Sequence, residues 1–493
     1  MKILTSLVFA TFLSVHIYGA TLGVWSDTVS GFEMFPEDKQ TAANVSFTNT
    51  SLSVSATGSD FLVMSSFITS NAGTDKNRQG RWQIAEDYTG GPYTYSDAGS
   101  GGTVSGSAIY ERWINGHEIN GQNEYGAVNM NGIYHFGTSG THTFNLFHRT
   151  NGGAEINTGN GAMTVIALNV GGTTLRHGSS MQDTTINSGG PAPFFSETTG
   201  SSWSAVEKSA GVDLASTVDI SEFGGKIFLA TSWNCNKSGA GTDPVTGEWQ
   251  LVVYNNQGQV VERLDTTIKR DVIDENKDHG AAMLYATTSD LAKGEYTIKL
   301  EQRVSNGSTN KVETYNASIN AIALTLQDGS EAGQYFESFS VSDNNTTTNT
   351  TATFQQAVEK EGLSLSSDQG LILAANFTTS GSGAQTARLE MNVLEEGTTT
   401  SVFQSEEVLR TVGTSAGNGA AGVVGYSSLS AGDYDISLNF SHSTGDTNDL
   451  YITGAKMVGI TTESIPEPVV VSFIGGVAFF LVVGQRFRKR FFS

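Results

Sequence analysis

The sequence predicts an all-β protein made of three tandem antiparallel β-sandwich modules, and three observations lead to this prediction. Gly is very frequent (57 residues) and Pro is scarce (7) in a chain of 493 residues, which favours turn-rich β structure over a proline-rich stalk. The runs of Ala, Leu, Glu and Lys that form long helices are missing. Alternating apolar and polar residues recur in one order three times along the chain, as expected of half-buried strands.

The N-terminus has the layout of a secretory signal peptide. Lys2 precedes an apolar run from Ile3 to about Ile17, and Gly19 and Ala20 supply small residues for cleavage. The run is short for a membrane anchor. We therefore expect a signal peptide over residues 1–20, with the cleavage point left open.

The body repeats a strand with the same pattern in each third. The copies are GTHTFNLFHRT from Gly140, GEYTIKLEQRV from Gly294 and GDYDISLNFSH from Gly432. A second apolar strand follows each copy, and two more precede it. The spacing of about 140 to 150 residues suits an autonomous domain rather than a solenoid unit.

From these repeats we expect three β-sandwich modules, at residues 21–170, 196–327 and 333–461. Residues 171–195, rich in Gly, Ser and Thr, are expected to be a linker. The order of alternating strands resembles tumour-necrosis-factor-like jelly rolls. An immunoglobulin-like sandwich is the alternative, although no Cys…Trp…Cys spacing supports it.

The C-terminus carries an apolar segment between an acidic proline motif and a basic cluster. Residues 469–484 are uncharged and cover about 24 Å as a helix, or about 30 Å if extended to Phe487. The predicted transmembrane helix therefore covers about 469–487. The positive-inside rule places the basic cluster in the cytoplasm and the body on the other side of the membrane. The cluster consists of Arg486, Arg488, Lys489 and Arg490.

This three-part order over residues 464–493 resembles the PEP-CTERM sorting signal of exported proteins in Gram-negative bacteria. Its motif is Pro466, Glu467 and Pro468. The resemblance implies that an exosortase-type membrane transpeptidase recognises these residues and removes the tail. The prolines suit this reading because they keep the segment extended and accessible beside the bilayer. A plain single-pass anchor is the alternative.

Charge and cysteine content exclude several classes of function. The formal net charge of −22 repels nucleic acid backbones, so we expect no nucleic-acid partner. The single cysteine, Cys235, permits no intrachain disulfide and no multi-cysteine zinc site. It is expected to be a partly buried thiol rather than a nucleophile, since no paired base stands near it.

No catalytic or metal-binding set emerges from the remaining polar residues, and we expect no cofactor. His142 matches Tyr296 and Tyr434 in the other repeats, so it is expected to pack at the sandwich rim rather than bind metal. His135 has no carboxylate at a matching spacing. The segment Asp274–Gly280 alternates Asp and Asn but fails the calcium-loop pattern, and a solvated loop is expected.

Glycan contact is the main functional alternative that the residues leave open. Tyr88, Tyr93, Tyr95 and Trp113 have no clear counterparts in the other repeats and stand near Gly-rich segments, whereas Trp82 matches Trp249 and is expected in the core. We therefore expect an exported, non-enzymatic surface or matrix protein. The alternatives are a carbohydrate-binding or carbohydrate-active secreted protein and a permanently membrane-anchored adhesin.

Overall fold

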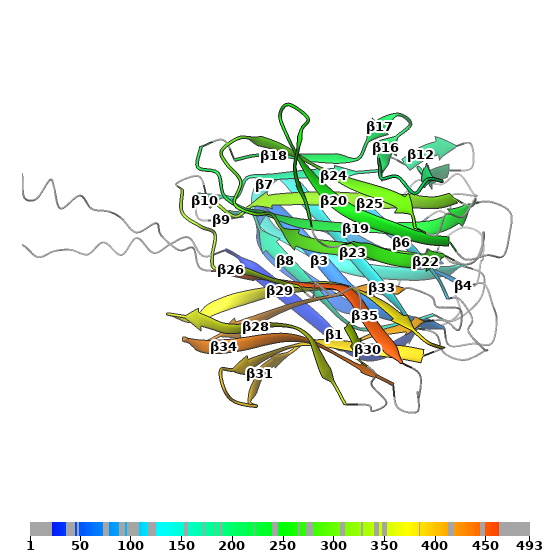
Figure 1. The fold of residues 1–493 in the computed structure, drawn as a ribbon. Helices are drawn as coiled ribbons and strands as arrows, with labels where there is room; N and C mark the ends of the chain where they lie inside the picture. Colours follow the sequence, from blue (N-terminus) through cyan, green and yellow to red (C-terminus); the bar gives the residue numbers. More distant parts are fainter. Residues whose placement is uncertain are drawn as a thin grey trace, which may run out of the picture.

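A computed structural model describes residues 22–462 with internal gaps, and every regular element among the described residues is a β-strand (Figure 1). The gaps are 36–44, 47–48, 72–77, 88–93, 96–107, 117–124, 152–155, 171–172, 183, 188–189, 221, 239–244, 265–266, 273–279, 306–310, 327–328, 340–344, 348–352, 384, 413–418 and 444–448. The predicted all-β class with antiparallel sheets is confirmed.

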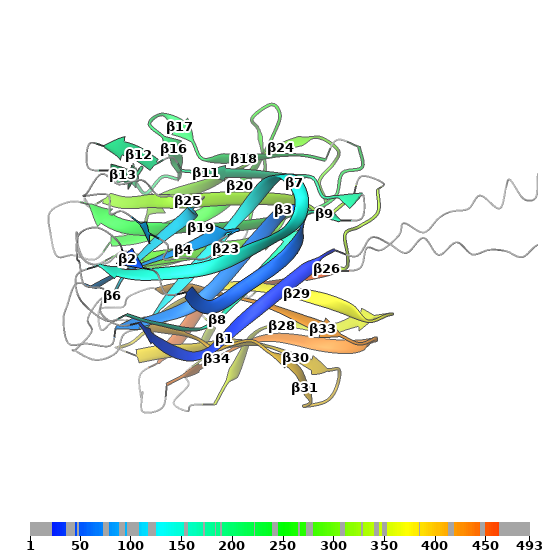
Figure 2. The ribbon, with the colours of Figure 1, turned by 180° about the vertical axis from the view of Figure 1, so that it is seen from behind.

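Residues 24–170 contain set 1, a six-stranded sheet in the order β1-β8-β3-β7-β4-β6. Its two longest strands, β3 and β7, pair along two halves with an irregularity between Gly58 and Asp60. Figure 2 shows both strands curving across the body. The strands are β1 (Val24–Phe35), β3 (Asn49–Asn71), β4 (Arg78–Glu86), β6 (Ala108–Gly116), β7 (Tyr125–Asn151) and β8 (Ile156–Ala167).

Set 2 forms two sheets. The first has the order β11-β25-β19-β23, with β14 also on β25; the second has β15-β24-β20-β21, with β18 on β24 and β22 on β20. The strands are β11 (His177–Met181), β14 (Ser196–Thr198), β15 (Ser204–Ala205), β18 (Ala215–Asp219), β19 (Ile227–Ser238), β20 (Val245–Asn255), β21 (Val260–Arg263), β22 (Ile268–Val272), β23 (Gly280–Thr287), β24 (Glu295–Val304) and β25 (Lys311–Ala323).

Set 3 repeats this arrangement, except that one strand, β28, pairs with β34 where both β15 and β18 pair with β24 in set 2. One sheet has the order β26-β35-β29-β33, with β27 on β35, and the other has β28-β34-β30-β31, with β32 on β30. The strands are β26 (Tyr335–Phe339), β27 (Asn345–Thr347), β28 (Gln355–Leu365), β29 (Gln369–Gly381), β30 (Gln385–Glu395), β31 (Ser401–Gln404), β32 (Val408–Val412), β33 (Gly419–Leu429), β34 (Gly432–His442) and β35 (Leu450–Thr461).

Short two-stranded ribbons complete the described structure. They are β2 (Val45–Ser46) with β5 (Thr94–Tyr95), β9 (Asn169–Val170) with β10 (Thr173–Thr174), β12 (Thr184–Asn187) with β13 (Gly190–Pro193), and β16 (Glu207–Ser209) with β17 (Val212–Asp213). The segment expected to be a linker, 171–195, therefore contains strands. Within it, β11 pairs with β25 from His177 to Met181 and extends a sheet of set 2.

Strand register relates the three sets residue by residue. β8, β25 and β35 each carry one β-bulge against the neighbouring β3, β19 or β29, where two residues of the bulged strand face one large, buried aromatic residue. The first residue of each bulge, Asn160, Asn316 or Gly454, has a positive φ. When residues are counted from the bulge in each set, the remaining strands of the three sets also align. The residues opposite the bulges are Phe67, Trp233 and Phe377.

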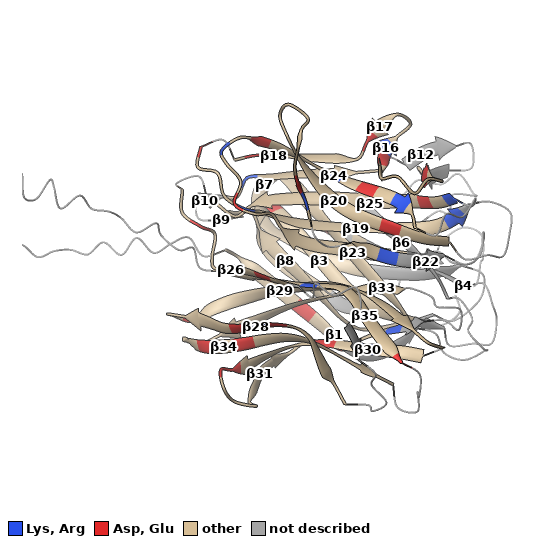
Figure 3. Ribbon diagram, viewed as in Figure 1, with Lys and Arg blue, Asp and Glu red and all other residues tan. Residues whose placement is uncertain are grey.

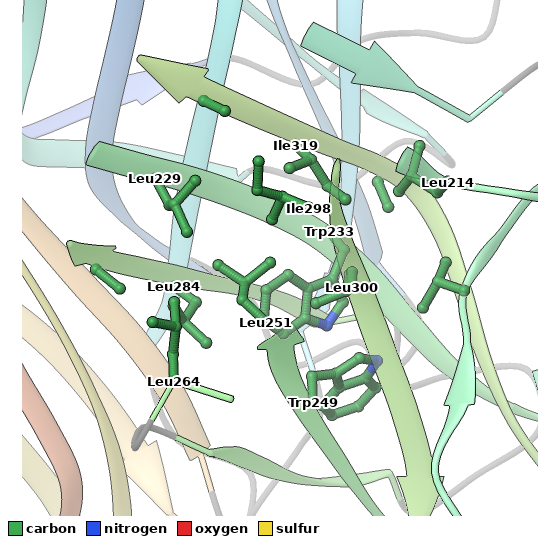
Figure 4. Packing of buried hydrophobic residues seen from close by; sticks show 14 of the residues in the cluster. Leu214, Leu229, Trp233, Trp249, Leu251, Leu264, Leu284, Ile298, Leu300 and Ile319 are labelled. Atoms are coloured by element: carbon green, nitrogen blue, oxygen red, sulfur yellow. The ribbon is translucent and has the colours of Figure 1, made fainter. Parts of the chain in front are cut away.

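Each set has its own buried core, and a further core joins all three. Figure 4 shows the core of set 2, where Trp233 and Trp249 pack with Leu251 and Leu300 between the two sheets. The shared core takes apolar side chains from the first-named sheet of sets 2 and 3 and from β3 and β8 of set 1. Its corresponding members include Leu62, Phe228 and Ile372 on one row and Ile166, Ile322 and Ile460 on the next.

Hydrogen bonds between sets follow one cyclic rule. In each set, β7, β23 or β33 lies beside β3, β19 or β29, on the side away from the bulged strand. This strand donates a backbone N–H to the side chain just before Phe67, Trp233 or Phe377 in the next set of the ring. The three bonds are Asn131 N–H to Ser232 Oγ (3.3 Å), Tyr285 N–H to Asn376 Oδ1 (2.8 Å) and Val424 N–H to Ser66 Oγ (3.0 Å). Set 1 thus contacts set 2, set 2 contacts set 3, and set 3 contacts set 1, so the sets close a ring.

Candidate functional site

The predicted sorting motif lies outside the described residues. This holds for Pro466, Glu467 and Pro468, for the predicted helix at about 469–487, and for the basic cluster of Arg486, Arg488, Lys489 and Arg490. Residues 1–20 also lie outside. Within the described part of the chain, no helix has the length and apolar character needed to cross a membrane.

His142 occupies the rim position predicted for it. Its Nε2 faces the carbonyl of Thr138, four residues upstream, at 3.3 Å. The Tyr296 and Tyr434 hydroxyls donate to carbonyls at the same offset, those of Ala292 (2.7 Å) and Ser430 (2.8 Å). Register places the three residues at one position of the repeat. The packing role predicted from the Tyr exchange is therefore confirmed.

The His142 corner also carries two carboxylates. Its Nδ1 lies 2.7 Å from Asp87 Oδ2, and Asp87 Oδ1 accepts the Thr143 N–H at 2.9 Å. Both imidazole nitrogens of His142 face acceptor oxygens. Burial, reinforced by the Asp87 charge and opposed by His142, raises the pKa of Glu86 to about 7.

A second acidic cluster joins sets 1 and 2, and sequence spacing did not reveal it. Asp60, which is buried, contacts His135 Nδ1 and the Asn169 amide, and its Oδ2 lies 4.0 Å from His177 Nε2. The expectation that His135 lacks a carboxylate fails in three dimensions, because β3 and β7 pair Asp60 directly with His135.

The outward face of β20 and β24 in set 2 holds two buried carboxylates. Glu248 accepts Arg303 Nε at 2.6 Å, and Lys269 Nζ lies 3.6 Å from its other oxygen. Glu301 accepts three donors at 2.8 Å each, from Gln250, Tyr254 and Arg263.

These contacts determine the electrostatics of that face. Burial alone would raise the pKa of Glu301, but the donors from Gln250, Tyr254 and Arg263 hold it below its ordinary value. Burial together with the bond to Glu301 raises the pKa of Tyr254 to about 12. Glu301 is therefore held as an anion beneath its cationic partner Arg263, and Glu248 lies in the same way beneath Arg303 and Lys269.

The other candidates divide into buried residues and residues outside the described part. Cys235 is fully buried in the core of set 2. Trp82 and Trp249 are core residues as predicted, and their indole N–H groups donate to Thr158 (3.0 Å) and Thr314 (2.8 Å). Nothing is described for 273–279 or for the side chains of Tyr88, Tyr93, Tyr95 and Trp113. In the described residues, no three His, Cys, Asp or Glu side chains are grouped to hold a metal.

Comparison with known proteins gives weak structural likeness only. No family model and no curated protein matches the chain. A CBM22-1–CBM22-2 tandem domain from Paenibacillus barcinonensis Xyn10C has a TM-score of 0.18 at 10% identity, over 56% of this chain and 97% of its own. The infectious bursal disease virus Gx strain structure gives 0.21 at 7%, over 95% and 88%. The bacteriophage PM2 spike protein P1 gives 0.19 at 10%, over 62% and 97%. Scores this low carry no argument about ligand or function.

Proposed function

We propose that the protein is an exported, non-enzymatic surface or extracellular-matrix protein whose body is a ring of three tandem β-sandwich modules, sets 1 to 3. The observation that supports this proposal is that the two ends of the described body are hydrogen-bonded to each other. The Leu22 N–H donates to the Thr462 carbonyl at 2.8 Å, and the Thr462 N–H donates to the Gly370 carbonyl at 2.9 Å. The first described residue is thus bonded to the last.

Because the two ends of the body meet, the body can be held at the cell surface by a single attachment point. The sorting segment 464–493 follows Thr462 almost directly, so a tether there holds the body at one pole and leaves the rest of the ring accessible. In this proposal the tail has the PEP-CTERM function that its sequence resembles. An exosortase-type transpeptidase cuts near Pro466-Glu467-Pro468 and releases the mature protein to the cell surface or matrix. A permanently anchored adhesin is the alternative outcome.

The non-enzymatic part of the proposal is supported by the bonding of two titratable groups, Glu301 and His142. Glu301 is saturated by three donors, and both nitrogens of His142 face structural acceptors. Groups fixed in this way stabilise the fold and are not poised to exchange protons with a substrate.

Mass spectrometry of the protein purified from its native cell tests the tail processing. We expect C-terminal peptides that end near the motif and no peptide that spans Glu467 to Val471. A Glu467→Ala variant should retain the junction, because the recognised motif is altered, while a Glu463→Ala variant outside it should be processed normally. Recovery of the intact junction in most surface-exposed wild-type molecules would identify a permanent anchor instead.

A further inference from the structure

The outer sheet of set 2 presents a group of cations that set 3 lacks at the corresponding positions. Four basic side chains stand on one face of β20, β21, β22 and β24 and are 27–48% exposed. They are Arg263, Lys269, Lys299 and Arg303. In Figure 3, basic and acidic residues lie interleaved on this part of the ribbon.

The carboxylates that pair with these cations lie beneath them. The Glu248 and Glu301 side chains are only 5% and 8% exposed. Only Asp213, which pairs with Lys299 at 2.6 Å, is comparably exposed, at 43%. Four cations against three carboxylates leave a net charge of +1 among these groups, and the exposed atoms are mainly positive. The whole chain carries −22, so these rows of the sheet differ in sign from the chain as a whole. The exposed Glu295 and Asp219 stand opposite each other farther along β24 and β18.

The cations are held in place before any ligand arrives. The Arg303 guanidinium lies 4.4 Å from the centre of the Trp203 ring, and Lys299 Nζ lies 5.0 Å from that of Tyr254. The strand register arranges the four cations in two rows. Lys269 and Arg303 flank Glu248 in one row. Arg263 and Lys299 flank Val252 in the other. A fixed array loses little side-chain entropy on binding a repeating anion.

Set 3 provides an internal comparison. At the positions matching Lys269, Arg303, Arg263 and Lys299 it has uncharged residues, namely Leu409, Ser441, Gln404 and Ser437. The sandwich therefore does not require cations there. Set 1 has Arg149 at the position of Arg303 but Trp113 at that of Lys269, so the full group of four stands in set 2.

We propose that this face of set 2 binds an anionic, carboxylate-bearing polysaccharide. Charge complementarity selects the ligand, because the −22 body repels a polyanion everywhere except where exposed cations are concentrated. A polymer with regularly spaced carboxylates can pair with several rows of cations at once. The proposal does not depend on how the tail is processed.

Binding of the full-length mature protein to alginate, a polymer of uronic acids, tests this inference, with neutral dextran as the comparison polymer. The variant Lys269→Leu/Lys299→Ser introduces the set 3 residues and leaves Glu248 with Arg303 and Glu301 with all its donors. We expect this variant to bind alginate at least about tenfold more weakly than the wild-type protein does. The control Lys311→Ser/Lys360→Ser changes net charge equally, away from this face, and should bind like wild type.

The salt dependence of alginate binding tests the proposal with the wild-type protein alone. Raising the ionic strength from about 20 mM to about 500 mM should abolish wild-type binding to alginate, because exposed charges are screened. Equal weakening in both double variants, or equal affinity for dextran, would overturn the proposal. So would unchanged binding by the Lys269→Leu/Lys299→Ser variant. Equally tight binding of polyglutamate with the same dependence on Lys299 would reassign the face to acidic peptides.

Discussion

The backbone N–H of Tyr285 on β23 donates a 2.8 Å hydrogen bond to the side-chain oxygen of Asn376 on β29, across the boundary between sets 2 and 3. Ser66 and Ser232 accept the corresponding bonds at the other two boundaries. The same backbone position thus serves as donor in all three sets. One polar acceptor per set, directly before the aromatic residue that faces a β-bulge, links the three sets into a ring.

Replacing Asn376 by Ala should lower the free energy of unfolding by about 1–3 kcal/mol, because the buried Tyr285 N–H loses its acceptor. Asn376→Ser is the matched control, since Ser performs this role in the other two sets, and it should retain much of the stability. Urea unfolding measures both variants. Equal losses for the two variants would mean that packing, not the hydrogen bond, stabilises this boundary.

Truncating the equivalent buried leucines tests whether each set has its own core. Leu146, Leu300 and Leu438 occupy one register position but lie in three different cores. Each change to Ala should reduce stability by about 2–5 kcal/mol through the cavity it leaves. Hydrogen exchange should report the loss mainly in the substituted set. Uniform loss of protection in all three sets would indicate a single cooperative core.

Removing the rim hydroxyls should give equal, small effects. Tyr296→Phe and Tyr434→Phe each delete one bond to the carbonyl four residues upstream and keep the ring in place. We expect each to lower the free energy of unfolding by about 0.5–1.5 kcal/mol. Thermal or urea unfolding measures this. A loss in one variant and none in the other would contradict the equivalence of the two corners.

Set 1 should become less stable as the pH rises through neutrality. The pKa of Glu86 is raised in the folded state to about 7, above its ordinary value of 4.5, so the folded protein binds this proton more tightly than the unfolded chain. The stabilisation is complete below about pH 4.5 and is lost as the pH approaches and passes 7.

Melting temperatures between pH 5 and pH 8 test this dependence. Glu86→Gln should flatten the decline, because the amide does not ionise. Glu406, whose pKa burial also raises, provides a comparison in set 3, and Glu406→Gln should leave the decline attributed to set 1 unchanged. A Glu86→Gln variant with the wild-type pH profile would contradict the assignment.

Local periodicity was enough to determine the strand class and the repeated positions. Phe144 and Leu146 alternate with polar residues, so their burial is visible in a window of a few residues. The exchange of His142 for Tyr296 and Tyr434 indicated a rim position in the same way. The sequence also predicted the core positions of Trp82 and Trp249, because both stand near the start of the same strand of the repeat.

Only the tertiary structure decided which residues meet across long distances. The carboxylate of Asp60 and the ring of His135 are brought together by pairing of β3 with β7, and no spacing rule connects them. The cations Arg263 and Lys299 look unremarkable in sequence and form an array because β21 and β24 flank β20. Periodicity records which face of a strand is buried. Periodicity gives no information on strand order or on the packing of one sheet on another. These two features determine both the ring and the position of its exposed charges.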